Sequence, residues 1–157
     1  LRRRARKVRK IDKSVQSLAD DLIDTLHDVG GVGLASNQVG VLRRVIAIQL
    51  PEEKEPRVYI NPEIVHREGR REVEEGCLSI PGYHALIFRS ILVKATGLDR
   101  RSKLIRLDAE GLLAQALEHE VDHLNGIVYI DHLESHQQLV KNEPDLENAP
   151  TQILTMV

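Results

Sequence analysis

The run Glu118-His119-Glu120-Val121-Asp122-His123-Leu124-Asn125-Gly126 contains the pattern His-Glu-x-x-His within a segment whose apolar residues have helical spacing. Four residues along an α-helix rise roughly 6 Å, little more than one turn, so His119 and His123 project from one face toward a single metal ion. Glu120 lies one step round the helix, where a carboxylate can take a proton from water at the metal. The pattern indicates hydrolysis. The alternative is a solvated helix face with two incidental histidines.

A catalytic site of this type needs a third protein ligand, because three protein ligands and one open position are usual for catalytic zinc. Cys77, the only cysteine, lies in Glu75-Gly76-Cys77-Leu78-Ser79, on a segment rich in turn residues. A thiolate with two imidazoles suits Zn²⁺ or Fe²⁺, whereas Ca²⁺ and Mg²⁺ prefer oxygen ligands. A lone cysteine is more often a small buried hydrophobic residue, but the histidine pair makes Cys77 the best candidate for the third ligand.

Two other patterns compete with this interpretation. His132 and His136 have the same spacing, but no glutamate follows the first of them, so we interpret both as solvated residues of a closing helix. One subclass of metalloprotease extends its motif to His-x-x-Gly-x-x-His, and here Gly126 holds the glycine position while Tyr129 replaces the third histidine. Tyrosine is a poor substitute ligand, which favours Cys77.

Composition limits the class of protein. With 157 residues, 41% of them apolar and 29% charged, the chain is long enough for one globular domain with a real core. A formal net charge of -2 gives no overall electrostatic case for nucleic-acid binding, and no apolar run approaches the length of a membrane span. A single cysteine fits a reducing compartment. Residues 1–10 are strongly basic. We expect a solvated surface segment there, with a transit peptide or a nucleic-acid arm as alternatives.

Apolar spacing predicts a first helix over residues 11–29, with Asp12 or Ser14 as its N-cap and Gly30-Gly31 as its end. A glycine-punctuated stretch follows, and then come short β-rich runs at residues 41–50, 57–60, 64–67, 91–98 and 103–107. We expect Asp108 to cap a second helix that ends near Asn125. Residues 1–140 are expected to form a single catalytic domain, followed by a weakly ordered polar tail over residues 141–157. This order predicts an α+β fold, not a doubly wound parallel sheet.

Three blocks of the sequence resemble peptide deformylases and occur in the order of that family. They are Gly31-Val32-Gly33-Leu34-Ala35-x-x-Gln38-Val39-Gly40, Glu75-Gly76-Cys77-Leu78-Ser79 and His119-Glu120-Val121-Asp122-His123-Leu124-Asn125-Gly126. The resemblance covers about residues 1–139, and it implies small antiparallel sheets packed around a central metal-binding helix. One departure is Ser36-Asn37, where the family commonly has Ala followed by a variable residue, often Pro. This departure concerns rate and inhibitor fit more than the reaction itself.

The resemblance also implies roles for single residues. One divalent metal ion per chain, Fe²⁺ in preference to Zn²⁺ or Ni²⁺, would bind three ligands: Cys77, His119 and His123. Glu120 would be the general acid and base. The side-chain amide of Gln38 and the backbone N–H of Leu78 would hold the formyl oxygen as it gains negative charge.

The substrate site follows from the same resemblance. The substrate backbone would pair with the strand edge at Val32-Gly33, and the methionine side chain would enter a pocket formed by Val32, Leu112, Gln115, Ala116 and His119. For Leu112, pure core packing is an equal alternative. Glu75 and Arg89 would form an ion pair that braces the cysteine loop, or else a surface pair of little energetic value.

The expected activity is that of a metal-dependent amidase, which removes the formyl group from the N-terminal N-formylmethionine of newly made polypeptides and releases formate. The alternatives are a His-Glu-x-x-His metalloendopeptidase and a non-catalytic deformylase-like protein. We expect nascent N-formyl-Met polypeptides as partners, transient association with the ribosome, a monomeric state, and no nucleic-acid or membrane function. The expected location is a bacterial-type cytoplasm, with an organellar stroma or matrix as the second choice.

Overall fold

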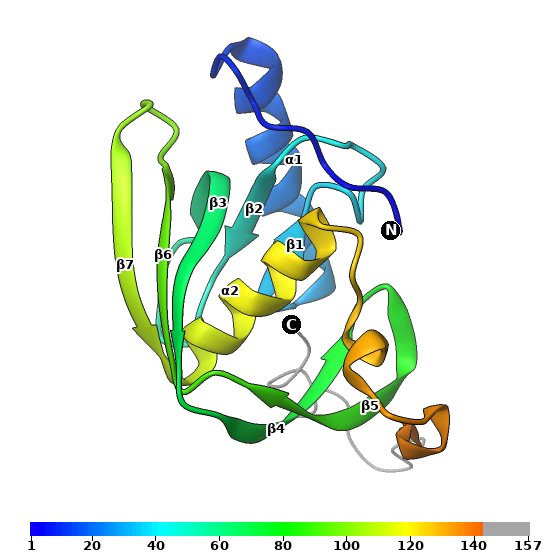
Figure 1. Cartoon of the computed structure of the whole chain (residues 1–157). Coiled ribbons are helices and arrows are strands. Elements are labelled where there is room, and N and C mark those ends of the chain that lie inside the picture. The colour runs from blue at the N-terminus through cyan, green and yellow to red at the C-terminus, as the bar shows by residue number, and fades with distance from the viewer. Residues whose placement is uncertain (143–157) are drawn as a thin grey trace.

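The computed structural model describes residues 1–142, so nearly all of the predicted polar tail, residues 143–157, lies outside the described part of the chain. The elements follow in the order α1 (Lys13–Val29), β1 (Gly33–Ala35), β2 (Val45–Ile48), β3 (Arg57–Glu68), β4 (Arg71–Cys77), β5 (Ile80–Arg89), β6 (Leu92–Leu98), β7 (Leu104–Glu110), α2 (Gly111–Leu124), the 3-10 turns η1 (Tyr129–His132) and η2 (His136–Gln138), and β8 (Val140–Lys141). Figure 1 shows the α+β architecture that the sequence predicts.

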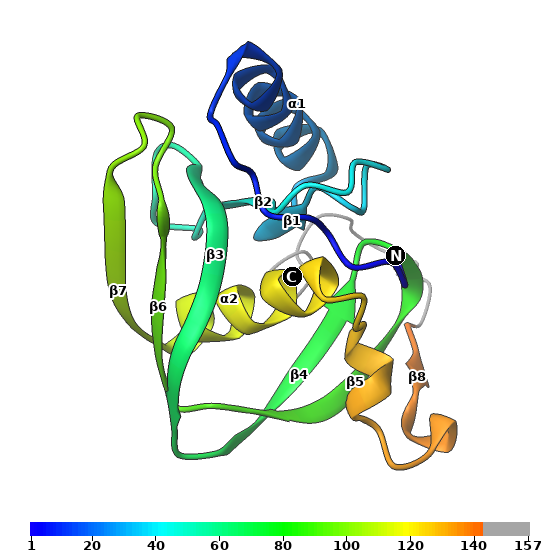
Figure 2. The ribbon, with the colours of Figure 1, turned by 45° about the horizontal axis from the view of Figure 1, so that its top comes forward.

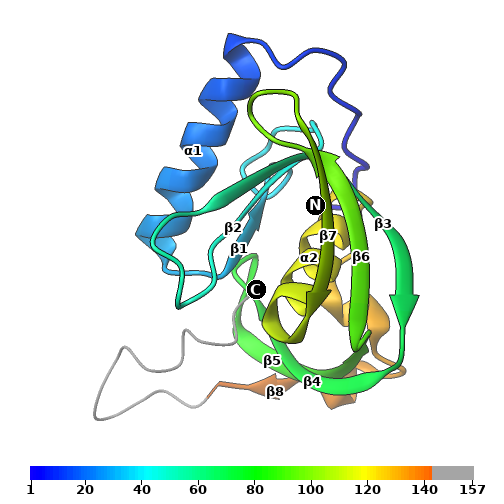
Figure 3. The same cartoon turned by 90° about the vertical axis from the view of Figure 1, so that its left-hand side faces the viewer.

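Helix α2 occupies the middle of the molecule. A five-stranded antiparallel sheet with the order β1-β2-β3-β6-β7 lies on one side of it, and a three-stranded antiparallel sheet with the order β4-β5-β8 lies beyond it (Figures 1 and 3). Helix α1 packs against β1 and β2 on the outside of the larger sheet. The central helix is therefore enclosed by strands, as the resemblance implied, and its side chains are shielded from water.

Helix α1 begins and ends close to the predicted residues. The carboxylate of Asp12 accepts hydrogen bonds from the backbone N–H groups of Ser14 (3.0 Å) and Val15 (3.2 Å), which identifies Asp12 as the N-cap. Gly30 ends the helix in the left-handed conformation that glycine adopts without strain, at φ 69°. Val15, Leu18, Leu22 and Leu26, which gave the helical spacing in the sequence, are buried together with Ala19, whereas Val29 at the end of the helix is 44% exposed.

Asn61-Pro62 does not end a strand, so the prediction of two separate runs at residues 57–60 and 64–67 is wrong. Both runs belong to β3, and the pairing register with β6 shifts between Ile60 and Glu63. Asn61 adopts φ 52° at this irregularity. Such a bulge accommodates Pro62, which has no N–H to donate to the ladder. The predicted run at 41–50 is shorter than expected, because only Val45–Ile48 pairs as β2.

The sequence analysis missed strands β4, β5 and β8, and it expected the strand edge at β1 only from the resemblance. In β5, Leu86 and Phe88 are exposed, and Arg89 is buried on the same face as Ala85 and Ile87, so the usual alternation of apolar inside and polar outside is lost. Strand β4 likewise buries Glu75. Cys77 is consequently the last residue of a β-strand, and the turn residues that the sequence indicated follow it directly at Leu78-Ser79.

Asp108 is not the cap of the second helix. Strand β7 continues to Glu110, because residues 108–110 pair with β6 and Ala109 is buried in the core. The pairing with β6 keeps the backbone of residues 108–110 extended, so the helix cannot begin there, and α2 begins only at Gly111. The predicted closing helix is also wrong, since two short 3-10 turns take its place.

The basic N-terminal segment crosses the C-terminal end of α2 before it reaches α1 (Figure 2). The N–H of Ala5 donates to the carbonyl of Leu124 (2.9 Å), and Ala5 is buried, whereas residues 1–4 are exposed. This agrees with the predicted surface segment. No helix within residues 1–142 is long and apolar enough to cross a membrane.

Candidate metal centre

Three candidate ligands converge at one point between α2 and the end of β4. The Nε2 atoms of His119 and His123 are 3.0 Å apart, and the Sγ atom of Cys77 lies 3.3 Å from Nε2 of His123. All three ligand atoms lie within 4.8 Å of one another, and all three residues are buried. The helical spacing brings the two imidazoles together, and the cysteine arrives from a strand that ends against the helix.

These residues fit a transition-metal ion. Ligand atoms that bind one tetrahedral ion at about 2.0–2.3 Å lie roughly 3.3–3.6 Å from one another. The separations of 3.0 Å and 3.3 Å are close to that spacing. One sulfur and two imidazole nitrogens form a donor set that suits zinc or iron.

The electrostatics of the site favour one cation. Burial alone would lower the pKa of His119, but hydrogen bonds with Cys77 and Glu75 outweigh it and raise that pKa to about 10. Burial, followed by the neighbouring charge of His119, lowers the pKa of His123 to about 3. The surroundings therefore stabilise a single positive charge among the thiol and the carboxylates, which is the environment that a bound metal cation needs.

Glu120 is buried beside the ligands, and neither carboxylate oxygen has a hydrogen-bond partner among the described residues. Burial raises the pKa of Glu120 to about 7. Gly33 in β1 lies against this side chain, because a Cβ atom built on Gly33 would be 2.5 Å from Oε1 and 2.9 Å from Cγ of Glu120. The glycine thus leaves room for the carboxylate, and the two predicted site residues share one small space.

Gln38 turns its amide nitrogen toward the cysteine. Its Oε1 accepts a hydrogen bond from the N–H of Ala35 (2.7 Å), while its Nε2 lies 3.2 Å from Oγ of Ser79 and 3.9 Å from Sγ of Cys77. Leu78 stands between those two residues in the chain. The backbone N–H of Ser79 donates to Sγ of Cys77 (3.4 Å). Two N–H donors, one from the side chain of Gln38 and one from the backbone of Ser79, therefore point toward Sγ of Cys77.

The unusual Ser36-Asn37 pair has structural partners. Oγ of Ser36 donates to the carbonyl of Arg43, and Nδ2 of Asn37 donates to the carbonyl of His123. Both residues are buried. Asn37 therefore braces the backbone of His123, the second histidine of the candidate site.

Glu75 and Arg89 form a buried ion pair, so the surface-pair alternative is wrong. Arg89 donates from Nε (3.0 Å) and Nη2 (2.7 Å) to the two oxygens of Glu75, and the side chains are 3% and 0% exposed. Oε1 of Glu75 also accepts from Nδ1 of His119 at 2.6 Å. Burial would raise the pKa of Glu75, but its hydrogen bonds with His119 and Arg89 hold it well below the usual range.

The sequence analysis missed two members of this network. Nη1 of Arg89 donates to Oδ2 of Asp122 (2.6 Å), and Nε2 of His132 lies 2.8 Å from the same oxygen. His132 is therefore not an incidental solvated residue. Asp122 lies three residues after His119, on the same face of the predicted helix. A carboxylate at that position was a signal for a partner, because a buried charge needs one. No local pattern pointed to His132, and the side chain of His136 lies outside the described part.

The predicted pocket residues lie on the central helix, except for Val32, which directly precedes β1. Val32 and Ala116 belong to one hydrophobic cluster, and Leu112 packs against it. Gln115 is buried, and its Nε2 donates to the carbonyl of Glu74 (3.0 Å). The hydroxyl of Tyr129 donates to the carbonyl of Tyr83 (3.2 Å). Contact of the pocket residues with substrate stays a prediction.

Comparison with known proteins gives consistent matches. The family model described as polypeptide deformylase matches residues 1–139. A peptide deformylase of Dehalococcoides mccartyi strain CBDB1 is 53% identical over 147 residues, which cover 94% of this chain and 88% of the relative. The crystal structure of a peptide deformylase from Legionella pneumophila has a TM-score of 0.83 at 43% identity and covers 87% of this chain and 81% of its own. A Synechococcus elongatus peptide deformylase in complex with actinonin has a TM-score of 0.84 at 37% identity, with coverages of 88% and 77%.

Proposed function

The chain belongs to the peptide deformylase family, and from this premise we propose how its own residues carry the reaction. The enzyme is a metal-dependent hydrolase that removes the formyl group from the N-terminal N-formylmethionine of newly made polypeptides and releases formate. The observation that supports our assignment of residues is the convergence of Cys77, His119 and His123 beside Glu120, which is buried and has no hydrogen-bond partner among the described residues.

Cys77, His119 and His123 hold the metal in this proposal. When bound, a divalent transition metal supplies a Lewis acid that acidifies water and polarises a carbonyl oxygen. Nδ1–H of His119 donates to Glu75, which leaves Nε2 of that ring free as a ligand atom. We propose Fe²⁺ as the physiological ion, with Zn²⁺ and Ni²⁺ as alternatives. Elemental analysis of anaerobically purified protein distinguishes them.

Glu120 moves the proton. Its carboxylate can accept a proton from the attacking water and later return it to the leaving amine, and burial, which raises the pKa of Glu120 above its usual value, makes it a stronger proton acceptor than an exposed glutamate. The absence of protein donors to its oxygens, among the residues that the structure describes, keeps both oxygens available for that transfer. Gly33 keeps the space that the carboxylate occupies.

Gln38 and Leu78 stabilise the formyl oxygen as negative charge develops on it. The bond from Ala35 N–H to Oε1 fixes the amide plane of Gln38, so that Nε2 is the atom that faces Cys77 and Ser79. A donor held in place before the reaction stabilises the transition state without reorganisation. The backbone N–H of Leu78, next to the thiol ligand, is the second donor in this proposal.

We expect Gln38→Leu to lower kcat by about 10²–10³, the usual effect of losing one oxyanion donor. The metal content and the thermal unfolding temperature of the metal-loaded protein should stay close to wild type. Steady-state kinetics with N-formyl-Met-Ala and elemental analysis measure these quantities. Ser79→Ala is the control, because it removes the hydroxyl partner of Gln38 and leaves the amide in place. An unchanged kcat in Gln38→Leu would contradict the oxyanion role.

The substrate backbone pairs with β1 in this proposal. Strand β1 is an edge strand of the five-stranded sheet, and β2 is its partner on the other side. An extended peptide can add to such an edge through main-chain hydrogen bonds. The methionine side chain then enters a pocket formed by Val32, Leu112, Gln115, Ala116 and His119.

This pocket predicts a preference for an unbranched apolar first residue. A substrate whose first residue lacks the thioether side chain of methionine should have a kcat/KM about 10–200-fold below that of the N-formyl-Met peptide, the equivalent of roughly 1–3 kcal/mol. N-formyl-Met, N-formyl-Gly and N-formyl-Asp peptides with identical second residues give the comparison. Equal kcat/KM values for the three peptides would rule out the pocket.

One assay separates the deformylase from the two alternatives. We expect formate release from N-formyl-Met-Ala, no acetate release from N-acetyl-Met-Ala, and no cleavage of internal peptide bonds. A non-catalytic protein would bind the formyl peptide without releasing formate. The presence of Gln38, Cys77, His119, Glu120 and His123 together supports the catalytic outcome.

We further propose that the enzyme is a monomer that meets its nascent substrates through transient association with the ribosome, in a bacterial-type cytoplasm. An organellar stroma or matrix is the second choice. Residues 1–140 would form the single catalytic domain. Analytical ultracentrifugation and co-sedimentation with ribosomes test the first two points.

A further inference from the structure

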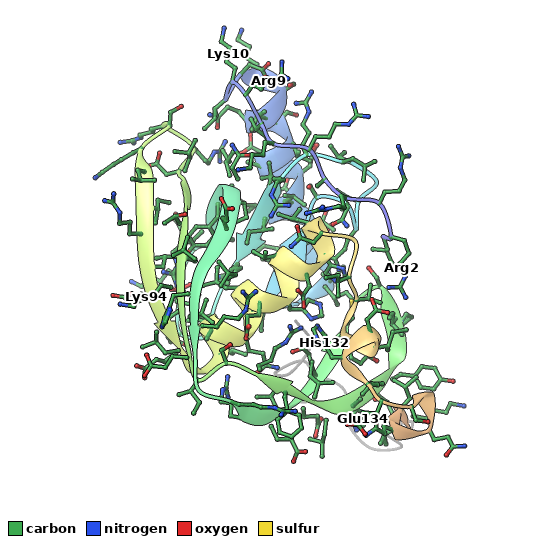
Figure 4. The ribbon with its side chains drawn as sticks, in the orientation of Figure 1. Arg2, Arg9, Lys10, Lys94, His132 and Glu134 are labelled. Atoms are coloured by element: carbon green, nitrogen blue, oxygen red, sulfur yellow. The ribbon has the colours of Figure 1, made fainter. Side chains whose placement is uncertain are left out.

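A chain of polar side chains connects the surface with the metal ligand His119. From the outside inward, it consists of His132 in η1, Asp122 in α2, Arg89 in β5, Glu75 in β4 and His119 in α2. The successive contacts measure 2.8 Å, 2.6 Å, 2.7 Å and 2.6 Å. Figure 4 shows His132 between η1 and the central helix.

Arg89 is shared between two carboxylates. Its guanidinium makes two bonds to Glu75 and one bond to Asp122, so one buried cation faces two buried anions. Buried carboxylates need donors, because water cannot replace them. Arg89 serves both acids at once, but Asp122 receives only one of its three bonds, so the carboxylate of Asp122 has room for another donor.

His132 supplies that donor. Its Nε2 reaches Oδ2 of Asp122, the oxygen that also accepts from Arg89. The side chain of His132 is 34% exposed, whereas those of Asp122, Arg89 and Glu75 are 11%, 3% and 0% exposed. His132 thus donates a hydrogen bond to the carboxylate of Asp122 from the solvent side. Arg89 keeps its two hydrogen bonds to Glu75.

We propose that His132 is a positioning residue for the metal centre. Its hydrogen bond to Asp122 keeps Arg89 on Glu75, and Glu75 holds the ring of His119 with Nδ1 as donor and Nε2 toward the metal. The inference rests on the proposed role of His119 as a ligand. It assigns a function to a residue outside the Cys77, His119 and His123 cluster.

The test compares His132→Phe, which removes the donor but keeps a planar ring, with His132→Gln, whose side-chain amide keeps a donor. His66→Phe is the matched control, because His66 is also exposed and lies 3.6 Å from its acidic neighbour Glu68. The probe is Co²⁺ added to metal-free protein, followed by chelator competition and by the thiolate-to-cobalt absorption band. Thermal unfolding of the metal-free proteins and separate kcat and KM values for N-formyl-Met-Ala complete the set.

We expect His132→Phe to weaken Co²⁺ binding by about tenfold, the lower end of the range for partners behind metal ligands, and to shift the absorption band. KM and the unfolding temperature of the metal-free protein should not change. His132→Gln should recover both the affinity and the spectrum, and His66→Phe should match wild type. Equal Co²⁺ affinity in His132→Phe and wild type would overturn the inference, as would equal losses in both His132 variants. If wild type itself binds no metal, the proposed function fails instead.

Discussion

Cys77→Ala should lose the metal and, with it, nearly all deformylase activity. Cys77 is the only sulfur ligand of the cluster, and its Sγ lies 3.3 Å from Nε2 of His123. Loss of a partner behind a ligand already costs about 10–100-fold in metal affinity, so loss of a direct ligand should cost more. Elemental analysis after anaerobic purification and formate release from N-formyl-Met-Ala measure the two effects.

Cys77→Ser is the matched control, because it keeps a small buried side chain and replaces the thiolate with a poorer ligand for zinc or iron. It should retain the fold and bind metal weakly. Circular dichroism of the metal-free proteins shows whether either variant fails to fold. Full metal occupancy in folded Cys77→Ala would exclude Cys77 as a ligand. With Fe²⁺ bound, wild type should also lose activity in air or peroxide, because iron and thiolate both oxidise.

The sequence predicted the metal cluster better than the strands around it. The His119 and His123 pair follows from helix geometry alone, and the need for a third ligand identifies Cys77 across 42 positions of sequence (119 minus 77). Strands β4 and β5 were missed because their buried faces carry Glu75 and Arg89, so hydrophobic alternation fails there. These same two charges form the ion pair whose carboxylate is hydrogen-bonded to His119.

The errors at Asp108 and His132 have a common cause. Local propensity favours Asp108 as a helix cap, but pairing with β6 extends β7 to Glu110. The residues next to His132 in the sequence do not indicate that its side chain forms a hydrogen bond, because its partner Asp122 lies on another element. Tertiary contacts decide both positions, and such contacts have no local sequence pattern.

Glu120→Ala should separate catalysis from metal binding. Glu120 adjoins a ligand without belonging to the cluster, so metal content should stay near wild type. Loss of the proton carrier should lower kcat by about 10²–10⁴. Because both oxygens of this buried carboxylate lack partners among the described residues, the metal-free variant should unfold at the wild-type temperature or above it. Glu120→Gln should be equally inactive, since an amide cannot accept the proton.

Glu118→Ala is the control that should show the opposite result. Glu118 lies on the same helix, accepts from Ser90 N–H (2.8 Å) and Oγ (3.0 Å), and pairs with Arg67 (2.8 Å). Its removal leaves a buried donor unpaired, which costs about 1–3 kcal/mol of stability, while kcat should hardly change. An active, metal-loaded Glu120→Ala would overturn the proton-transfer role. A folded but metal-free Glu120→Ala would make Glu120 a ligand. Two glutamates two positions apart would thus have different roles, because Glu118 has hydrogen-bond partners that stabilise the fold and Glu120 has none among the described residues.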